Sequence, residues 1–507
     1  MGKLFKSLIL IAFLCLETTA IAAPEVAGQG IQWYQGTVAQ GFAEAKASHK
    51  PVFLYWGAVW CPPCNQLKAT LFKNPAFIRK TALFVPVYLD GDTEAAQKLG
   101  EDFGVLGYPT LILFDSNGQE ITRLPGGMSM DLYPQMLDLA LAKTKPVATL
   151  VKEILQQHKQ ADRAEWHMLA YYSWDQDAGR ALGDDDLTGV LKTLAEQIPP
   201  TYTKERVRLD AAYLSALANR QQPPSDAEKR DALERLLRVL SLPETYADNF
   251  NFLIYELETL IPRITDAKSP QGQLVLQAWE RALQQLAQDK QLNPAQKLLV
   301  YAGKIHQLKV AKKQLPDALK KAIRDAVSHA RKIAGNGHER IAVNYAAYGI
   351  LKSSGQLGLA EQLITEEMQA GSNNQYWMLV LADLAAEAGN EAEALTWYAK
   401  AWETSTGTAT RIQWGSYYIR QLTEQTPDDD EKIIEVTERF FSQLAKQKTP
   451  FHGRSRRALE RVFKALNSWG QVSSPAELIR LKSAFIKVCM PFGKEAISRC
   501  EVIMKTT

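Results

Sequence analysis

The sequence predicts an α/β domain near the N-terminus, followed by a long all-α region of stacked helix pairs. Three observations predict this fold class. From about Gly30 to Lys143, short runs of strand-forming residues alternate with helical stretches. After Lys143 the strand signals end, and one helical stretch follows another with prolines between them. Part of this second region repeats with a period of 34 residues.

The composition is that of an ordinary soluble globular protein. The chain has 507 residues, of which 46% are hydrophobic and 23% are charged, and this excludes wholesale disorder. Such a length corresponds to about two to four domains. Lys and Arg number 59 against 56 Asp and Glu, a net charge of +3. The basic stripe of a dedicated nucleic-acid-binding protein is therefore not expected.

Residues 1–22 have the three parts of a cleaved secretory signal peptide. Lys3 and Lys6 form a positive start, residues 8–16 form a short apolar run, and Ala20-Ile21-Ala22 supplies the small residues of a cleavage site. No later segment has 18 uninterrupted apolar residues. We therefore expect an exported protein, periplasmic or secreted, without a membrane span after cleavage.

Residues 23–145 are predicted to form the α/β domain. Strands are expected at Ile31–Tyr34, Val52–Trp56, Leu83–Leu89, Thr110–Phe114 and Glu120–Leu124, and helices at Val38–Ser48, Cys61–Lys80, Thr93–Phe103 and Met130–Ala142. The Asn117-Gly118 pair between the last two strands is a hairpin signal. Helices between strands imply crossover connections and a covered sheet.

Residues 150–340 are predicted to be a solenoid-like region of helix pairs. The residues Leu233, Leu236, Leu237 and Leu240 fall at i, i+3, i+4 and i+7, which is the apolar face of an amphipathic helix. So long a helical chain cannot easily bury itself in one bundle, and stacked pairs solve this problem.

Residues 341–507 are predicted to be a helical region that resembles the tetratricopeptide repeat. Gly355 and Gly389 lie 34 residues apart, as do Ala360 and Ala394. In that repeat, small residues stand where a partner helix must approach, and glycine ends a helix.

One motif points to a specific chemistry: Trp60-Cys61-Pro62-Pro63-Cys64, directly after a predicted strand and at the start of a predicted helix. Cysteines at i and i+3 of a first helical turn share a face, so their sulfurs can bond reversibly. The helix start carries partial positive charge and favours the thiolate of Cys61. The two prolines remove two amide donors, which leaves the Cys64 amide near that sulfur. The motif predicts thiol–disulfide exchange, with an exposed Cys61 as attacking residue and Cys64 as resolving residue.

A fixed structural disulfide and half of a metal site are the alternatives for this pair. A zinc site would need two more ligands at a suitable spacing, but the sequence has no second CxxC motif and its histidines are scattered. Copper handling by the CxxC pair stays an alternative. We predict no metal site and no dissociable cofactor.

Cys489 and Cys500 are predicted to form a structural disulfide. With Cys15 inside the signal peptide, four cysteines remain, and an even number in an exported protein is consistent with pairing. The two residues flank a predicted turn at 491–493 and lack a helix-start setting, which disfavours a second redox pair.

Two motifs at the right separation, VFLYWGAVWCPPC and GVLGYPTLILF, resemble the thioredoxin fold family over about residues 31–143. The stretch from Lys50 through Cys64, followed by Leu71-Phe72-Lys73-Asn74-Pro75, is similar to the C-terminal domain of the bacterial thiol:disulfide interchange protein DsbD. The resemblance implies that the Tyr108-Pro109 bond is cis and faces the disulfide. It also implies that Trp60, Tyr108 and Pro109 shape the surface on which substrate docks.

Tyr55 departs from the family pattern. Thioredoxins carry a buried Asp six residues before the first cysteine, where it is thought to handle the proton of the second cysteine, and Tyr55 stands there. The departure implies that water or another carboxylate relays the proton, or that the reaction is less general. The direction of electron flow stays open.

These observations predict a periplasmic thiol–disulfide oxidoreductase that acts on protein disulfides or dithiols. Helical solenoids present extended concave surfaces, so we expect the helical repeats to hold the client or another protein partner. The redox partner that renews the pair is not identified. The alternative is a helical-repeat scaffold or chaperone whose thioredoxin-like domain is a redox-tuned docking module without turnover.

Overall fold

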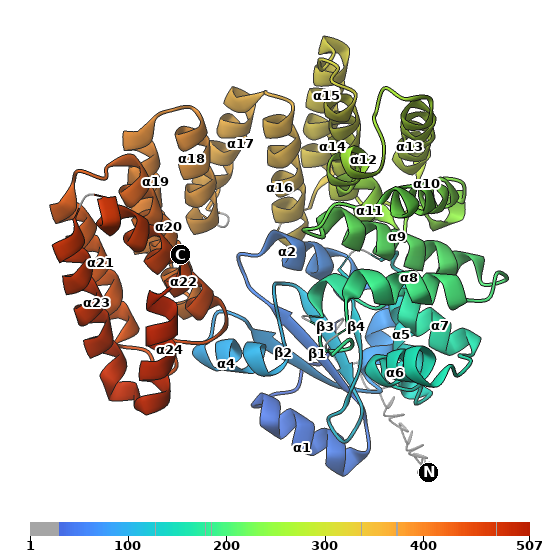
Figure 1. Cartoon of the computed structure of the whole chain (residues 1–507), viewed down its shortest axis with the longest axis horizontal. Helices are drawn as coiled ribbons and strands as arrows, with labels where there is room; N and C mark the ends of the chain where they lie inside the picture. The colour runs from blue at the N-terminus through green and yellow to red at the C-terminus, as the bar shows by residue number, and fades with distance from the viewer. Residues whose placement is uncertain are drawn as a thin grey trace, which may run out of the picture.

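The computed structural model of the protein describes residues 30–126, 128–177, 179–183, 185–335, 337–371, 374–472 and 474–506. The predicted signal peptide, residues 1–22, lies outside the described residues. A small α/β domain comes first and a long series of helices follows it (Figure 1).

The α/β domain is built on a four-stranded sheet with the order β2-β1-β3-β4. Its strands are β1 (Val52–Gly57), β2 (Val85–Asp90), β3 (Thr110–Phe114) and β4 (Glu120–Leu124). β1 pairs parallel with β2 and antiparallel with β3, and β3 pairs antiparallel with β4. The predicted hairpin is present, with Gly118 at a φ of 86° in the turn. Four of the five expected strands are therefore confirmed.

The fifth expected strand, Ile31–Tyr34, is not formed. Tyr34 donates one backbone hydrogen bond to Pro86 O, at 2.7 Å, but Pro86 has no N–H to give in return. Because Pro86 lies in the edge strand β2, its missing donor prevents a regular ladder with the segment before α1 (Val38–Ser48).

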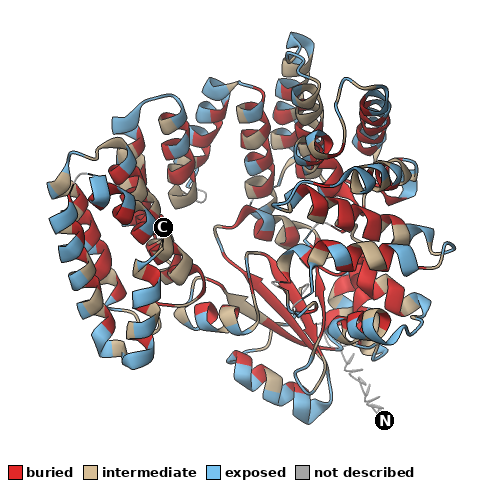
Figure 2. Cartoon of the chain, in the orientation of Figure 1, coloured by how far each residue is buried: buried red, intermediate tan, exposed pale blue. Residues whose placement is uncertain are grey.

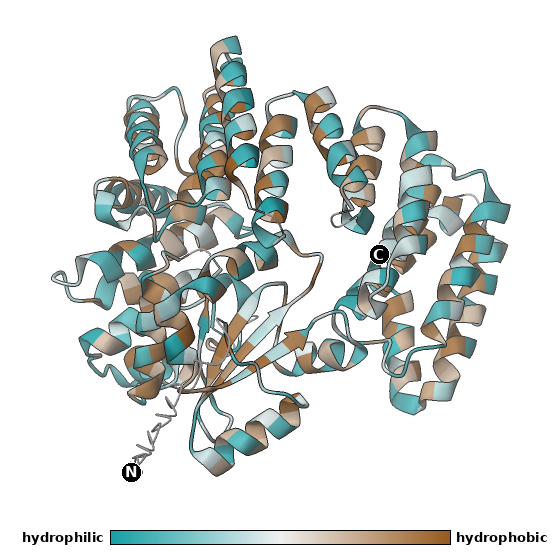
Figure 3. Ribbon diagram, turned by 180° about the vertical axis from the view of Figure 1, so that it is seen from behind, coloured by the Kyte–Doolittle hydropathy of each residue, from teal (hydrophilic) through white to brown (hydrophobic). Residues whose placement is uncertain are grey.

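Helices cover both faces of the sheet, as predicted. On one face, α1 and α4 (Glu94–Asp102) pack against β-strand residues that include Leu54 and Ile112. On the other face lie α2 (Pro62–Ala69), α3 (Pro75–Thr81) and α5 (Leu132–Leu141), which pack against residues such as Phe53 and Leu113. Figure 3 shows the apolar character of the strands between these layers.

The single helix expected at Cys61–Lys80 is interrupted. α2 is followed by the short 3-10 helix η1 (Leu71–Lys73) and by α3. Asn74 starts α3 because its side chain accepts hydrogen bonds from the amides of Ala76 and Phe77, at 2.9 and 3.1 Å. This is an N-cap, and Pro75 occupies the first helical position.

The rest of the described chain is helical. The α-helices are α6 (Val147–Gln157), α7 (Arg163–Ala170), α8 (Leu187–Gln197), α9 (Thr203–Asn219), α10 (Asp226–Val239), α11 (Phe250–Tyr255), α12 (Leu257–Ile264), α13 (Pro270–Gln288), α14 (Pro294–Val310), α15 (Asp317–Ile333), α16 (His338–Ser353), α17 (Leu357–Gln369), α18 (Asn374–Glu387), α19 (Glu391–Thr404), α20 (Thr408–Gln425), α21 (Asp430–Leu444), α22 (Gly453–Val472), α23 (Pro475–Cys489) and α24 (Lys494–Met504). Short 3-10 helices lie at η2 (Trp174–Gln176), η3 (Pro243–Thr245) and η4 (Met490–Phe492).

The helices form an arc that begins beside the sheet at α6 and returns to the α/β domain at its far end (Figure 1). Midway along the arc α16 contacts α2, and near its end α20 and α22 contact α4. The arc therefore touches the α/β domain on both sides of the segment that joins β1 to α2. Figure 2 shows buried residues where neighbouring helices of the arc face one another.

The glycines of the 34-residue period occupy equivalent places. Gly355 follows α16 with a φ of 72°, and Gly389 follows α18 with a φ of 76°. Positive φ values are easy only for glycine, so each glycine lets one helix end and the next begin. Assignment of these helix pairs to the tetratricopeptide repeat stays a prediction.

None of the helices in the described part of the chain is both long enough and apolar enough to cross a membrane.

Candidate active site

Cys61 lies at the start of α2, as the motif predicts. It is the N-cap residue, with Pro62 and Pro63 in the first turn. Its Sγ accepts a hydrogen bond from the Cys64 amide at 3.2 Å, and the two cysteines are joined in a disulfide. The donor next to the Cys61 sulfur is thus the amide that the two prolines leave available.

The cysteine pair is enclosed, whereas the sequence predicted an exposed Cys61. Cys61 is 2% exposed and Cys64 is 0% exposed. The side chains of Trp60 and Tyr108 pack against the pair, and residues of the helical arc line the space in front of it. The exposure expectation was wrong because Trp60 and Tyr108 of the same domain pack over the two sulfurs.

A series of hydrogen bonds holds the backbone of residues 59–61, the segment that precedes α2. The buried Asn65 Nδ2 donates to Val59 O at 3.0 Å and to Cys61 O at 2.9 Å. Its Oδ1 therefore faces His338 Nδ1, which lies at 2.5 Å at the start of α16. Burial lowers the pKa of His338, and Lys68 and Lys73 lower it further. The neutral ring with its proton on Nδ1 is the tautomer that suits Asn65 Oδ1.

Tyr108 and Pro109 lie beside the pair. The Tyr108-Pro109 peptide bond is cis. The Tyr108 hydroxyl donates to Gly91 O at 2.9 Å and accepts from Gln97 Nε2 at 3.2 Å. Tyr108 lines the space in front of Cys61, and Pro109 is buried behind it. Their role in docking substrate stays a prediction.

Tyr55 fills the place of the missing acid. Its side chain is 1% exposed, and its hydroxyl has no hydrogen-bond partner among the described residues. Gly57 makes room for it, because a Cβ on that residue would lie 2.3 Å from the Tyr55 hydroxyl oxygen. Burial raises the pKa of Tyr55, with a smaller contribution from Tyr88, so the phenol stays neutral and cannot serve as the base.

Asp90 is a half-buried carboxylate whose charge interacts with that of Lys68 on α2. It ends β2 opposite Gly57. Burial raises the pKa of Asp90 and lowers the pKa of Lys68 on α2, and the attraction between the two groups opposes both shifts. Cys64 and Lys68 share a face of α2 because they are four residues apart.

Asp92 joins the redox motif to the helical arc. Its carboxylate accepts from Trp60 Nε1 at 2.8 Å and from Arg454 Nη1 at 3.1 Å. The Thr410 hydroxyl donates to the same carboxylate, and the Thr408 hydroxyl donates to Asp92 O at 2.6 Å. Trp60 also lies over Tyr376 of α18, with ring centroids 6.1 Å apart. No sequence motif marks these partners, since they are distant in the chain.

A cleft of about 330 Å³ opens in front of Cys61. The α/β domain contributes Trp60, Cys61 and Tyr108 to its walls, and the arc contributes tyrosines and arginines of α16, α18 and α22. This volume lies at the lower end of the range for small-molecule sites. The redox pair is therefore reached through a space that both parts of the molecule enclose.

Cys489 and Cys500 lie far along the arc, at the end of α23 and within α24. They form a disulfide with a Cα–Cα distance of 6.6 Å, and both are 0% exposed. Neither lines the cleft in front of Cys61. Their structural role stays a prediction. In the described ranges, no group of three or more His, Cys, Asp or Glu could hold a metal ion.

Comparison with known proteins agrees with this geometry. The thioredoxin-like domain family matches residues 38–141, and these residues form a thioredoxin-like domain. The predicted resemblance and the predicted fold class, a thioredoxin-like α/β domain followed by a helical region, are both confirmed.

Three relatives show how far this likeness extends. The thiol:disulfide interchange protein DsbD of Yersinia pestis is 35% identical over 105 residues, which are 20% of this chain and 18% of that protein. The bifunctional thioredoxin reductase/thioredoxin of Mycobacterium leprae is 36% identical over 90 residues, 18% of this chain and 19% of that protein. Thioredoxin H4 of Arabidopsis thaliana is 29% identical over 94 residues, 18% of this chain and 75% of that protein. The chain thus spans less than a fifth of the DsbD proteins that it matches.

Proposed function

We propose that this protein is a thiol–disulfide oxidoreductase that works through Cys61 and Cys64. The observation that carries the proposal is the Cys61–Cys64 disulfide at the first turn of α2, within a thioredoxin-like domain and at the wall of a cleft. The relatives that share this domain include proteins named for thiol:disulfide interchange. Cys61 and Cys64 both lie within residues 38–141, the stretch that matches the thioredoxin-like domain family.

The reaction follows from the positions of the two sulfurs. In the reduced protein, the Cys61 thiolate attacks one sulfur of a substrate disulfide, and the other substrate sulfur leaves as a thiolate. A mixed disulfide then joins Cys61 to the substrate. The Cys64 thiolate attacks Cys61 Sγ, which closes the Cys61–Cys64 disulfide and releases the second substrate thiolate. Two electrons pass from the cysteine pair to the substrate, and the reverse sequence oxidises a dithiol.

We further propose an extracytoplasmic location, with the helical arc as the part that selects the client. The predicted signal peptide and the likeness to DsbD support the location, and a bacterial periplasm fits both. The arc contributes six of the thirteen residues that line the cleft in front of the pair, which supports a role in substrate selection.

The experiment uses the mature chain with Cys61→Ser and Cys64→Ser variants. Reduction of a protein disulfide by dithiothreitol should be accelerated by the wild type and not by Cys61→Ser. Cys64→Ser should accumulate a mixed disulfide through Cys61, detectable by mass spectrometry on non-reduced samples. Absence of both turnover and mixed disulfide would overturn the proposal.

A second candidate function has one observation in its favour. Because Cys61 is only 2% exposed behind the arc, the domain could act as a redox-sensitive docking module of a helical scaffold. In that case the wild type would show no turnover with any reductant, and the helical arc would bind the same protein partner with either cysteine variant.

A further inference from the structure

The cleft in front of Cys61 is lined by positive charge. Arg454, Arg457 and Arg461 reach it from α22. Their spacing of i, i+3 and i+7 places all three on one face of that helix. No Asp or Glu is among the described residues that line this cleft. A substrate sulfur that reaches Cys61 must therefore pass beside these guanidinium groups.

Two of the three arginines have no carboxylate partner among the residues that the structure describes. Arg454 pairs with Asp92 at 3.1 Å, but Arg457 donates to Leu106 O at 3.3 Å and Arg461 to Ser416 Oγ at 2.8 Å. Within the described part of the chain, neither of these two forms an ion pair. Each guanidinium has five N–H donors, so both keep donors for a ligand.

The two other fully buried arginines of the described chain have carboxylate partners, whereas half-buried ones such as Arg208 and Arg263 donate to neutral oxygens. Arg123 lies 2.6 Å from Glu120, and Arg235 lies 2.7 Å from Asp210. Arg457 and Arg461 are half-buried without such a partner, and burial lowers the pKa of both. A cation withdrawn from water without a counter-charge costs free energy. A bound anion would remove that cost.

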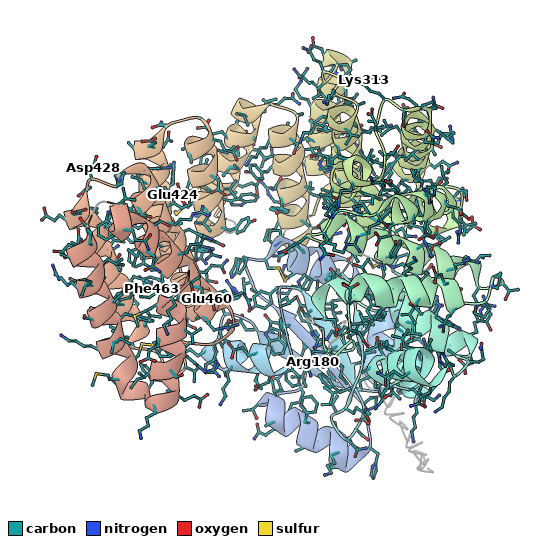
Figure 4. All side chains as sticks on the ribbon, viewed as in Figure 1. Arg180, Lys313, Glu424, Asp428, Glu460 and Phe463 are labelled. Atoms are coloured by element: carbon teal, nitrogen blue, oxygen red, sulfur yellow. A yellow bond between two sulfur atoms is a disulfide. The ribbon has the colours of Figure 1, made fainter. Side chains whose placement is uncertain are left out.

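The cleft continues into a second hollow of about 300 Å³. Aromatic residues of the arc such as Trp414 and Tyr417 line it, together with Arg420 and with Asp383, whose carboxylate accepts from the Tyr398 hydroxyl. Trp60 and Tyr376 line both hollows. The Arg461 guanidinium lies 4.7 Å from the centre of the Tyr417 ring. This contact holds Arg461 between the cleft and the second hollow. Figure 4 labels Glu460 and Phe463 of α22, the helix that carries the three arginines. The combined space suits an extended chain with a few side chains rather than the surface of a folded protein.

We propose that this cleft binds an acidic, cysteine-containing peptide segment. Its carboxylates pair with Arg457 and Arg461 while its sulfur meets Cys61 Sγ. The inference rests on the proposed function, because it names the substrate class of the same site, and the exchange step is the balanced one described above.

The test compares three short peptide disulfides that differ only in the residues beside the cysteine: Glu, Gln or Lys. With the wild type, kcat/KM should be about tenfold higher for Glu than for Gln, and lower again for Lys, as expected for a charge-assisted hydrogen bond. The double variant Arg457→Gln/Arg461→Gln should lose this preference, mainly through KM. Arg480→Gln is the control, because Arg480 lies on α23 with its own partners, Glu438 and Glu477.

A second readout does not depend on turnover. Peptides with Ser in place of Cys should bind the wild type with the same order of affinities, followed by calorimetry, and the double variant should lose that order. The acidic peptide is assayed both free and embedded in a longer unfolded chain. Preference for the acidic form in either arm supports the inference.

Hydroxyethyl disulfide, which is uncharged, separates the two proposals. If the wild type and the double variant reduce it equally but no peptide shows a charge preference, the acidic-substrate inference is overturned and the oxidoreductase proposal stands. If the wild type reduces neither this probe nor any peptide, the oxidoreductase proposal is overturned and the inference falls with it.

Discussion

Single side chains around the cysteine pair have separable tasks. The Cys64 amide contacts the Cys61 sulfur, Asn65 holds the backbone in front of α2, and Tyr55 fills the place where a thioredoxin has an acid. The motif could predict the first of these tasks, because it depends on neighbours in the chain. It could not predict the partner of Asn65, since His338 is 273 residues away.

Replacement of Tyr55 by Phe should not weaken the protein. The Tyr55 hydroxyl is buried without a partner, so its removal should leave the free energy of unfolding unchanged or raise it by about 1 kcal/mol. Tyr133→Phe is the matched control, because the Tyr133 hydroxyl donates to Pro125 O at 2.8 Å. That variant should lose about 1 kcal/mol. Denaturant unfolding measures both, and an equal loss in the two variants would contradict this account of Tyr55.

Replacement of Asn65 by Ala should slow disulfide exchange. It removes the donor to the Val59 and Cys61 carbonyls, so the attacking sulfur is no longer held in place. We expect about tenfold lower kcat/KM with hydroxyethyl disulfide and a loss of about 1–3 kcal/mol in stability.

Asn467→Ala is the matched control for that variant. Asn467 also donates to two carbonyls, those of Met504 and Thr506, but at the far end of α22. It should lower the free energy of unfolding and leave kcat/KM unchanged. Equal kinetic effects in the two variants would show that Asn65 acts only through general stability.

Among the helices, α4 is the element on which the end of the arc rests. Glu101 at its C-terminal end lies 2.9 Å from His452 Nδ1, 3.3 Å from Arg456 and 3.2 Å from Arg499, and it accepts from the Gly453 amide at 2.9 Å. Burial alone would raise the pKa of Glu101, but these hydrogen bonds and charges outweigh it and leave the pKa lowered.

Docking of the arc on α4 should therefore weaken in acid. The pKa of Glu101 is lower in the docked form than its ordinary value of 4.5. The stabilisation that the Glu101 carboxylate gives to docking is therefore complete above pH 4.5 and is lost as the pH falls below that value. Small-angle scattering should show a constant radius of gyration above that pH and an increase below it. Glu101→Gln should remove this dependence. A wild-type radius that stays constant down to pH 3 would contradict the role of Glu101.

At the scale of the whole molecule, the sequence predicts the elements of the α/β domain but not the contacts that join the end of the arc to that domain. Strand and helix periodicity placed β3, β4 and α1 correctly, and Pro86 and Asn74 account for the two differences in that domain. The contacts that enclose the cleft, such as Asp92 with Arg454, join residues 362 positions apart. Local pattern does not report such pairs.

Removal of the Asp92 side chain should open the arc. Its carboxylate holds Trp60, Thr410 and Arg454 together, so Asp92→Ala should increase the radius of gyration and speed the reduction of the Cys61–Cys64 disulfide by dithiothreitol. Asp325→Ala serves as the control, because Asp325 is exposed and pairs only locally with Lys321. An unchanged radius together with an unchanged reduction rate would show that Asp92 does not hold the arc closed.

The most direct measurement of the central claim is alkylation of the folded protein after mild reduction. The chain is reduced with dithiothreitol, treated with iodoacetamide at pH 7 and mapped by mass spectrometry at successive times. The account predicts that Cys61 is modified first, Cys64 later, and Cys489 and Cys500 only after unfolding. If Cys61 and Cys64 stay unmodified until the protein unfolds, the pair is a fixed structural bridge and the oxidoreductase account is wrong.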